Sequence, residues 1–361
     1  MNSDSARGRA LLAWFQAAAR DLPWRTRPAG QRDPYHVLVS ELMLQQTQVS
    51  RVVERYHAFI TRFPDFLALA RADVSDVLAL WAGLGYYRRA RLLHAAAIAI
   101  VSHHAGRMPR DINAIRELPG VGRYTAGAIA SMAFALPEPL VDGNVTRVIL
   151  RLEGRELASD EPAAQALAWR RAAELVAASD HPGAFNEALM ELGATVCTPA
   201  NPRCSACPWS HTCAAFGNQS QSNIPRPKKR AARQALRLEC VVLLDALGRV
   251  LLEPRPATGL WAGLWHMPST ESHGRARPDP ADLLNSLALP STPLAPAGSV
   301  KRTLTHRDVS LRVWAGRLSV RGPKLPGRAW FEPHALPAMS SAHAKVLERA
   351  HHALGALHKQ S

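Results

Sequence analysis

The stretch CTPANPRCSACPWSHTC, residues 197–213, holds four of the five cysteines of this 361-residue chain. Cys197, Cys204, Cys207 and Cys213 follow one another with the spacing C-x6-C-x2-C-x5-C. Four thiols in one short loop are typical of a pair of disulfides, a zinc site or an iron–sulfur cluster.

The context of the loop separates these three kinds of site. Dense disulfides belong to small secreted domains. The N-terminus lacks the apolar run of a signal peptide, and no apolar stretch reaches the roughly 18 residues of a membrane span. We therefore expect a cytoplasmic, nucleoid-associated protein with reduced thiols. Structural zinc sites pair two short knuckles, whereas only Cys204 and Cys207 form one. The spacing favours a [4Fe–4S] cluster and leaves zinc and disulfides as alternatives.

The composition indicates a folded chain that attracts polyanions. Hydrophobic residues make up 47% of the sequence, and the formal net charge is +15. Such a field favours nucleic acid, although a GC-rich genome would also enrich arginine. The length predicts two or three domains. The fifth cysteine, Cys240, lies in an apolar run and is predicted to pack in a core.

The pattern along the chain predicts two domains joined by a linker. Residues 1–216 carry apolar residues at helical spacing, separated by Pro and Gly. Residues 217–235 are polar and basic, as in a linker. Residues 236–361 begin with two strands, continue with strand character at 309–320 and close with a helix. The proline-rich stretch 277–298 is predicted to form loops.

A glycine-rich turn in LPGVGRYTAGAIASMAF (118–134) is the second specific feature. After Leu118, Gly120 and Gly122 flank Val121, and a helix of small residues follows. Glycines allow a close backbone approach, and a helix start offers free N–H groups. Such a hairpin (118–128) can hydrogen-bond a DNA phosphate without reading sequence. Alone, it is equally an ordinary corner between two helices.

The hairpin and the cysteine loop together resemble the helix–hairpin–helix DNA glycosylases that carry an iron–sulfur cluster. The resemblance implies that Cys197, Cys204, Cys207 and Cys213 hold a [4Fe–4S] cluster that orders the loop against the DNA backbone. The stretches SELMLQQTQV, LWAGLGYYRRAR, ELPGVGRYTAGAIAS, VDGNVTRV and FNEALMELGATVCT extend the resemblance, over nearly all of residues 10–216, to the MutY family of adenine DNA glycosylases.

The resemblance implies a multidomain fold. An all-α helix–hairpin–helix DNA glycosylase domain with the cluster loop is followed by an α+β Nudix-like domain. The latter rests on VVLLDALGRVLLEPRP, TGLWAGLWHMPS and TLTHRD.

Two carboxylates are candidates for cleaving an N-glycosidic bond. Glu41 lies in the apolar stretch VLVSELMLQQTQV, where burial would raise its pKa and keep it protonated. Taken alone, it could equally lie on the polar face of a helix. Asp142 precedes the helix in LVDGNVTRVILRL, where it reads as an N-cap kept ionised by the helix start. An acid can protonate the leaving base while an anion stabilises the oxocarbenium-like sugar.

The family resemblance assigns roles around these carboxylates. It implies that Glu41 protonates adenine at N7, that Asp142 stabilises the cation, and that Asn144 and Tyr124 arrange the transition state. In relatives that also cut the strand, a lysine stands where this chain has Tyr124. No lysine precedes Lys228, so a monofunctional glycosylase is expected.

Three further residues are assigned to the flipped base by the resemblance alone. Arg25 would lie near the adenine pocket, and Gln46 and Tyr86 would fill or wedge the base stack as adenine is flipped out. Without the resemblance, ordinary core or surface packing would explain Gln46 and Tyr86.

The C-terminal domain lacks the acidic metal-binding run of a Nudix hydrolase, so nucleotide hydrolysis is not expected. The resemblance implies that it senses 8-oxoguanine. The recognition loop of relatives commonly reads Phe-Ser-His, and Leu304, Thr305 and His306 take those places here. Thr305 keeps a hydroxyl for the lesion, whereas Leu304 removes an aromatic contact. On residue type alone, Thr305 and His306 are ordinary polar residues at a strand end.

The sequence thus predicts a monomeric base-excision repair enzyme that acts on double-stranded DNA and removes adenine mispaired with 8-oxoguanine or guanine. One alternative is a bifunctional endonuclease III-like glycosylase/lyase for oxidised pyrimidines. Another is a non-catalytic iron–sulfur DNA-binding protein.

Overall fold

The computed structural model describes most of the chain, with short gaps. The described residues are 3–227, 232–272, 278–287, 289 and 292–357. The predicted linker therefore lies partly outside them, at 228–231. Within the described part, no helix is long and apolar enough to cross a membrane.

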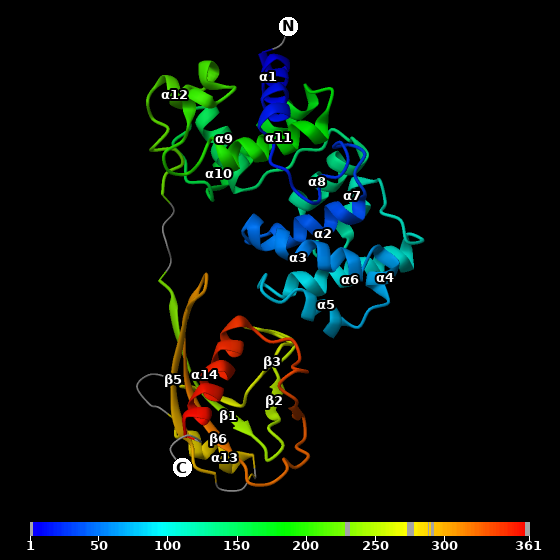
Figure 1. The fold of residues 1–361 in the computed structure, drawn as a ribbon. Helices are drawn as coiled ribbons and strands as arrows, with labels where there is room; N and C mark the ends of the chain where they lie inside the picture. The colour runs from blue at the N-terminus through cyan, green and yellow to red at the C-terminus, as the bar shows by residue number, and fades with distance from the viewer. Residues whose placement is uncertain (1–2, 228–231, 273–277, 288, 290–291, 358–361) are drawn as a thin grey trace. The chain divides into compact units, whose positions relative to one another are not determined.

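The chain divides into two compact units (Figure 1). The first unit comprises residues 1–72 and 89–229, and the second comprises residues 73–88 and 230–361.

The first unit is helical, as predicted. Its helices are α1 (Ser3–Ala18), α2 (Pro34–Leu44), α3 (Val49–Arg62), α4 (Phe66–Ala70), α6 (Arg88–His103), α7 (Ile112–Glu117), α8 (Arg123–Phe134), α9 (Gly143–Leu152), α10 (Pro162–Ala177), α11 (Pro182–Thr195) and α12 (Ala214–Gly217), with the 3₁₀ turns η1 (Cys204–Ala206) and η2 (Ser210–Thr212).

Helix starts in this unit are set by capping aspartates and prolines. The Asp33 side chain accepts the N–H of Tyr35 at 2.8 Å, and Pro34 occupies the first turn of α2. Most of α2 is buried, as its apolar sequence predicts. The Tyr35 hydroxyl donates to the carbonyl of Phe63 at 2.5 Å, which fixes the end of α3 against α2. These contacts fix the start of α2 and its packing against the end of α3.

Residues 218–227 lie within the segment that composition marks as a linker, and they pack on the first unit. Ile224 is buried, and its carbonyl accepts a hydrogen bond from Arg151 Nε at 2.8 Å. Arg226 pairs with Glu161 at 2.8 Å. One apolar residue and a few polar contacts thus fasten a stretch that composition alone marks as polar.

The second unit is built on a mixed sheet with strand order β3-β2-β1-β6-β5, in which β4 also pairs with β1 and β7 with β2. β1 and β6 run parallel, and the other pairs are antiparallel. Its elements are α5 (Val74–Leu80), β1 (Gln234–Leu244), β2 (Val250–Pro254), β3 (Trp265–His266), β4 (Ser269–Ser272), α13 (Pro280–Ser286), β5 (Ala295–Thr303), β6 (Arg307–Arg317), β7 (Ala329–Phe331) and α14 (Ser341–Leu357).

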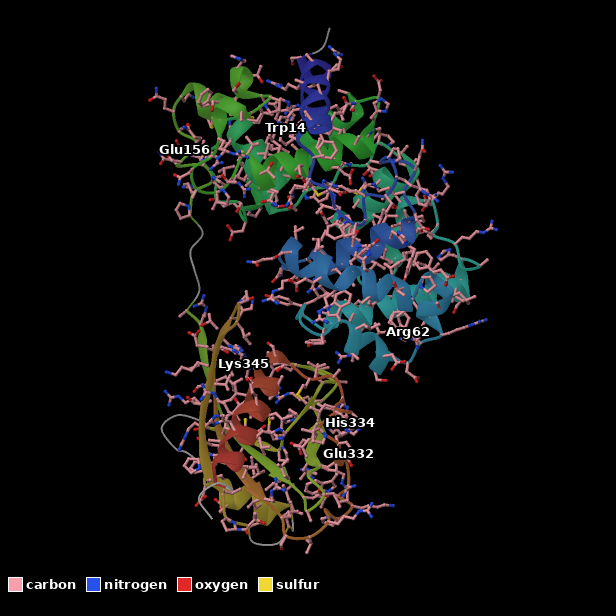
Figure 2. The ribbon with its side chains drawn as sticks, viewed as in Figure 1. Trp14, Arg62, Glu156, Glu332, His334 and Lys345 are labelled. Carbon is pink, nitrogen blue, oxygen red and sulfur yellow. The ribbon has the colours of Figure 1, made fainter. Side chains whose placement is uncertain are left out.

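The two faces of this sheet are covered by different helices. Alternate residues of β1, among them Cys240, pack with Val346 of α14, and those on the other face pack with Leu284 of α13. Lys345 lies on the exposed side of α14 (Figure 2). Cys240 is fully buried, which confirms its predicted place in a core.

The prediction of loops throughout 277–298 is wrong, because the structure places α13 and the start of β5 there. Asp279 caps α13 and accepts the N–H of Ala281 at 2.9 Å, and Pro280 occupies the first turn, where no N–H donor is needed. Pro296 lies in β5, at one end of the strand order, where a strand tolerates proline.

Candidate active site

A cavity of about 790 Å³ opens in the first unit, among α2, α8, α11 and the start of α9. Its lining combines carboxylates, arginines and apolar side chains. Among the predicted site residues, those that line it are Arg25, Glu41, Gln46, Gly120, Gly122, Tyr124, Asp142 and Asn144. The fold thus gathers onto one cavity residues that are spread over more than a hundred positions of sequence.

Glu41 is the buried acid of this cavity. Its side chain extends from α2 and is only 5% exposed. Burial raises the pKa of Glu41 to about 7, and the nearby carboxylates of Glu187 and Asp142 add to the rise, while the Tyr124 hydrogen bond and Arg32 oppose it. The burial and raised pKa predicted from the apolar sequence are confirmed. The side chain can therefore carry a proton near neutral pH.

Tyr124 stands beside this acid on the first turn of α8. Its hydroxyl lies 2.7 Å from Glu41 Oε2 and 3.1 Å from the sulfur of Met190 on α11. Burial, together with the charges of Glu41 and Asp142, raises the pKa of Tyr124 well above its usual value. The phenol therefore stays neutral and serves as a hydrogen-bonding group.

Asp142 caps α9 at the wall of the cavity. One carboxylate oxygen accepts the N–H of Val145 at 2.7 Å, and the other accepts the Asn144 side-chain amide at 3.0 Å. Burial raises the pKa of Asp142 above its usual value, against the pull of these hydrogen bonds and of Arg147. The expected cap is confirmed, but burial outweighs the ionising effect that the helix start was expected to have.

Arg147 fixes the orientation of Asn144. Its guanidinium donates to Asn144 Oδ1 and to the carbonyl of Gly193, both at 2.8 Å, and to the carbonyl of Cys197 at 2.8 Å. The amide of Asn144 is thereby turned so that its NH₂ faces Asp142. Sequence reasoning did not identify Arg147, although it follows Asn144 by three positions, which places the two residues on the same side of α9.

A second charged group on the cavity wall contains Arg25, which was assigned from the sequence, and two glutamates, which were not. Arg25 is 3.0 Å from Glu191, and Glu187 pairs with Arg32 at 2.7 Å and with Arg25 at 3.7 Å. Glu191 also binds Arg20 at 2.6 Å. The two acids lie four positions apart on α11, within the motif FNEALMELGATVCT. That spacing places them on one helix face, which is the signal that could have revealed them.

The hairpin lies between α7 and α8. Leu118 and Val121 are buried, and the N–H of Val121 bonds the carbonyl of Leu118 at 3.0 Å to close the turn. Gly120 has φ +77°, and a Cβ there would lie 2.6 Å from Leu92 Cβ. Gly122 precedes α8 without a side-chain cap, and a Cβ there would meet no atom within 4 Å. Leu118 and Val121 thus shape the turn, and the open backbone at Gly122 borders the cavity.

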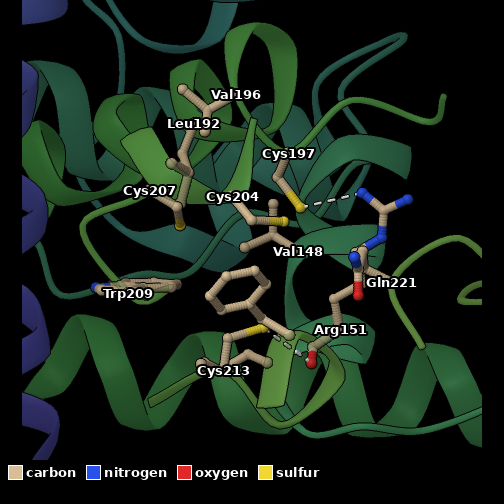
Figure 3. A pocket seen from close by; sticks show the side chains of 12 residues that line it. Val148, Arg151, Leu192, Val196, Cys197, Cys204, Cys207, Trp209, Cys213 and Gln221 are labelled. Atoms are coloured by element: carbon tan, nitrogen blue, oxygen red, sulfur yellow. Dashed lines mark hydrogen bonds between the residues drawn. The ribbon is translucent and has the colours of Figure 1, made fainter. Parts of the chain in front are cut away.

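The four clustered cysteines lie around a second, smaller cavity of about 30 Å³ in the same unit (Figure 3). All four are free thiols, so the disulfide alternative finds no pairing in the structure. Arg151 donates to Cys197 Sγ at 3.3 Å and to the carbonyl of Thr198 at 2.7 Å. Burial raises the pKa of the Cys207 thiol to about 12 and also raises that of Cys213.

The donor set of this cavity suits a soft, polynuclear metal group. The four thiols line one cavity together with Val148, Leu192 and Trp209, and the guanidinium of Arg151 lies beside Cys197 Sγ. Thiolates in an apolar shell with a hydrogen bond to sulfur are the usual surroundings of an iron–sulfur cluster. In the described part of the chain, no three or more His, Cys, Asp or Glu side chains are arranged to hold a metal ion as they stand.

Helix α1 holds this loop in place. The indole N–H of Trp209 donates to the carbonyl of Arg7 at 2.9 Å, and Arg7 Nε bonds the hydroxyl of Thr212 at 3.3 Å. Trp209 is buried, with its ring 6.5 Å from that of Phe185. The second half of the cysteine loop is therefore ordered by a helix about 200 positions away.

The residues assigned to base flipping and lesion sensing fall in both units. Gln46 is exposed at the rim of the cavity, with φ +54°. Within the second unit, the exposed Tyr86 has φ +47°, and its hydroxyl is 2.8 Å from that of Thr305. His306 is exposed, and its carbonyl accepts the N–H of Gln234. The structure thus brings Tyr86 and Thr305 together.

Comparisons with known proteins agree on the family. The model of the HhH-GPD superfamily base excision DNA repair proteins matches residues 39–173, and that of the NUDIX domain matches residues 239–349. The structure of a thermostable thymine-DNA glycosylase superposes with a TM-score of 0.53 at 29% identity, covering 60% of this chain and 97% of that one.

Curated relatives narrow the family further. The adenine DNA glycosylase of Homo sapiens is 37% identical, over 93% of this chain and 72% of the relative. That of Mycolicibacterium smegmatis is 46% identical, over 56% of this chain and 67% of the relative. With an alignment across both units at such identity, this chain belongs to the adenine DNA glycosylase family.

Proposed function

We propose that the protein is a monofunctional glycosylase that removes adenine paired with 8-oxoguanine or guanine. The observation that carries the proposal is that Glu41, a buried acid with a pKa of about 7, shares a cavity with the capped carboxylate of Asp142. The family membership supplies the substrate class, since the similar proteins bear the name adenine DNA glycosylase.

The reaction is hydrolysis of the bond between adenine and C1′ of its sugar. Once the base is flipped into the cavity, Glu41 gives its proton to adenine at N7, which turns the base into a better leaving group. The bond electrons leave with adenine, and the carboxylate of Asp142 faces the positive charge that forms on the sugar. Water then adds to C1′, and its released proton restores Glu41.

Two neutral residues hold this pair in position. Tyr124 contacts Glu41 at 2.7 Å, and Asn144 contacts Asp142 at 3.0 Å. Position 124 is Tyr, and no lysine precedes Lys228. Among the described residues that line the cavity there is no lysine whose amine could form a Schiff base. The abasic sugar is therefore left intact, without strand cleavage.

The remaining predicted residues take part in DNA binding. The backbone of Gly120, Val121 and Gly122, on a turn shaped by Leu118, would accept a close approach of a phosphate. Arg25 would border the flipped base, because it lines the cavity with Glu187 and Glu191. The formal net charge of +15 supports a long polyanionic partner.

Further residues complete the complex with damaged DNA. Gln46 would fill the gap left by the flipped base, and Tyr86 would wedge the stack. In the second unit, the hydroxyl of Thr305 and the neighbouring His306 would contact 8-oxoguanine. The chain would act as a monomer in the cytoplasm.

Cys197, Cys204, Cys207 and Cys213 would hold a [4Fe–4S] cluster, which when bound cross-links the loop. The support is that these four free thiols surround one cavity with apolar walls. In this arrangement Arg151 donates to Cys197 Sγ and would stabilise its thiolate.

Product analysis on matched duplexes tests the proposal. The full chain is incubated with duplexes that carry A opposite 8-oxoguanine, A opposite G, or C opposite 8-oxoguanine, and the strand is analysed with and without alkali. The proposal expects free adenine and strand breaks only after alkali, for the two adenine mispairs. A fourth duplex carries an oxidised pyrimidine opposite G. Breaks without alkali would support a lyase instead, and base release from the fourth duplex alone would overturn the adenine assignment.

A further inference from the structure

The sulfur of Met190 is a third group at the catalytic acid. Met190 extends from α11 and lines the same cavity as Glu41. Its Sδ lies 3.1 Å from the Tyr124 hydroxyl, which itself lies 2.7 Å from Glu41 Oε2. The three side chains therefore form a row from carboxyl to phenol to thioether.

The phenol has one hydrogen to share between two acceptors. When Glu41 is ionised, its carboxylate is the stronger acceptor and takes that hydrogen. When Glu41 carries its proton on Oε2, the carboxyl can donate to the Tyr124 oxygen instead. The phenol hydrogen must then find another acceptor, and the only role open to a thioether is that of a weak acceptor.

The sulfur of Met190 is important as an acceptor because the Tyr124 hydroxyl lies next to the buried carboxyl of Glu41. Glu41 is 5% exposed. Tyr124 as a whole is half-buried, but its hydroxyl lies between Glu41 Oε2 and the sulfur of Met190. A buried hydroxyl hydrogen without an acceptor costs free energy. The protonated form of Glu41 therefore costs less with a sulfur at position 190 than with a hydrocarbon side chain.

We propose that Met190 is a positioning residue of the glycosylase site: its thioether accepts the Tyr124 hydrogen while Glu41 holds its proton, and so stabilises the acid form of Glu41. The inference rests on the proposed function for its purpose, but the contact itself can be tested without turnover.

The other groups that face Glu41 act in fixed directions. Glu187 of α11 and Asp142 before α9 favour its proton, whereas Arg32 before α2 disfavours it. Tyr124 of α8 also disfavours the proton when it donates to the carboxylate. Met190 carries no charge. It acts only by offering the Tyr124 hydroxyl a second acceptor, its sulfur, in addition to the Glu41 carboxylate.

The first test is the titration of Glu41 in the full chain without DNA. Protein labelled with carbon-13 at the glutamate side-chain carboxyl is followed by NMR from pH 5 to 9, and the Glu41 signal is assigned by its loss in Glu41→Gln. In Met190→Leu, which nearly conserves volume, we expect the midpoint to fall by about 0.5 pH unit. A midpoint that is unchanged or higher would overturn the inference.

Two further variants separate the hydrogen bond from packing. Met43 is buried on α2, two positions from Glu41, and Met43→Leu makes the same chemical change away from Tyr124; its midpoint should match that of the parent protein. In a Tyr124→Phe background, Met190→Leu should no longer move the midpoint, because the shared hydrogen is gone. A shift that persists without the phenol would contradict the proposed route.

Base release separates this inference from the proposed function. If the parent protein releases adenine, the alkaline limb of its rate profile should move with the NMR midpoint in Met190→Leu. Adenine release with an unmoved midpoint would overturn the Met190 role and leave the function standing. A moved midpoint without any adenine release would support the contact and overturn the proposed function.

Discussion

Tyr124 Oη lies 2.7 Å from Glu41 Oε2, although the two residues are 83 positions apart in the chain. The contact joins the first turn after the glycine hairpin to the C-terminal half of α2. The same turn thus presents an open backbone at Gly122 and a phenol beside Glu41, the proposed catalytic acid. In the proposed mechanism, this arrangement ties phosphate binding to the position of the proton donor.

The rate of adenine release should depend on the protonation of Glu41. Its pKa is raised to about 7, chiefly by burial, so the acid form predominates below pH 7 and is lost as the pH rises above it. We expect the single-turnover rate to be level below pH 7 and to fall about tenfold per pH unit well above it. A rate that stays constant from pH 6 to 9 would exclude Glu41 as the proton donor.

Asn144 should be needed for activity more than for folding. Asn144→Ala removes one of the hydrogen bonds to the Asp142 carboxylate but leaves the Val145 N–H in place. We expect single-turnover adenine release to slow by about 10- to 100-fold, since hydrogen bonds to charged groups contribute about 1.5–3 kcal/mol. The thermal midpoint should change little.

Thr146 provides the matched control for Asn144. Its hydroxyl donates to the Asp142 backbone carbonyl at 2.8 Å and does not touch the carboxylate. Thr146→Val should therefore keep the rate of adenine release within a few-fold of the parent. Equal losses in the two variants would mean that Asn144 supports the helix start and not the carboxylate.

Replacing each of the two hairpin glycines by alanine should have a different effect: Gly120→Ala should lower stability, and Gly122→Ala should not. At Gly120, φ is +77° and an added Cβ would lie 2.6 Å from Leu92 Cβ, so Gly120→Ala should lower the free energy of unfolding by about 1–3 kcal/mol. At Gly122, φ is −86° and an added Cβ meets no protein atom within 4 Å. Gly122→Ala should keep its stability.

The affinity for DNA shows whether the backbone at Gly122 binds a phosphate or only forms the turn between two helices. If a phosphate approaches this backbone, the methyl group of Gly122→Ala should weaken the binding of an uncleavable duplex by about tenfold, or roughly 1.4 kcal/mol. Fluorescence anisotropy at fixed salt measures this. If Gly122→Ala binds the duplex with the affinity of the parent protein, Gly122 does not contact DNA.

Trp209 should govern how firmly the cysteine loop keeps iron. Trp209→Phe keeps an aromatic side chain, although a smaller one, and removes the hydrogen bond to the Arg7 carbonyl, which is worth about 1 kcal/mol. We expect iron to be lost to a chelator roughly fivefold faster, followed by the visible absorbance of the purified protein. Trp14, seven positions further along α1 (Figure 2), gives the control Trp14→Phe, whose iron loss should match that of the parent. If the parent protein, Trp209→Phe and Trp14→Phe lose iron at equal rates, the hydrogen bond of Trp209 does not help to hold the cluster loop.

Much of this arrangement follows from local sequence. The apolar surroundings of Glu41 predict its burial and raised pKa, and the position of Asp142 before a helix predicts its cap; both are confirmed. The spacing of the four cysteines predicts a common site, and they line one cavity. Each of these signals lies within about ten residues of the side chain concerned.

Contacts between distant segments were not predictable in this way. Nothing near Arg147 in the sequence indicates that it bonds both Asn144 and the carbonyl of Cys197. Similarly, Trp209 finds its acceptor on α1 only after the helices have packed. Pattern reasoning also missed α13, because proline at a helix start resembles proline in a loop.

The central claim is that the buried carboxyl of Glu41 supplies the proton that releases adenine. The most direct test compares single-turnover adenine release by the parent protein and by Glu41→Gln, on an A:8-oxoguanine duplex that both bind. The glutamine amide has nearly the shape of the glutamate carboxyl but cannot donate the acidic proton. The account therefore predicts that Glu41→Gln releases adenine about 10²- to 10⁴-fold more slowly, with a similar affinity for the duplex. A Glu41→Gln protein that releases adenine at the parental rate would contradict it.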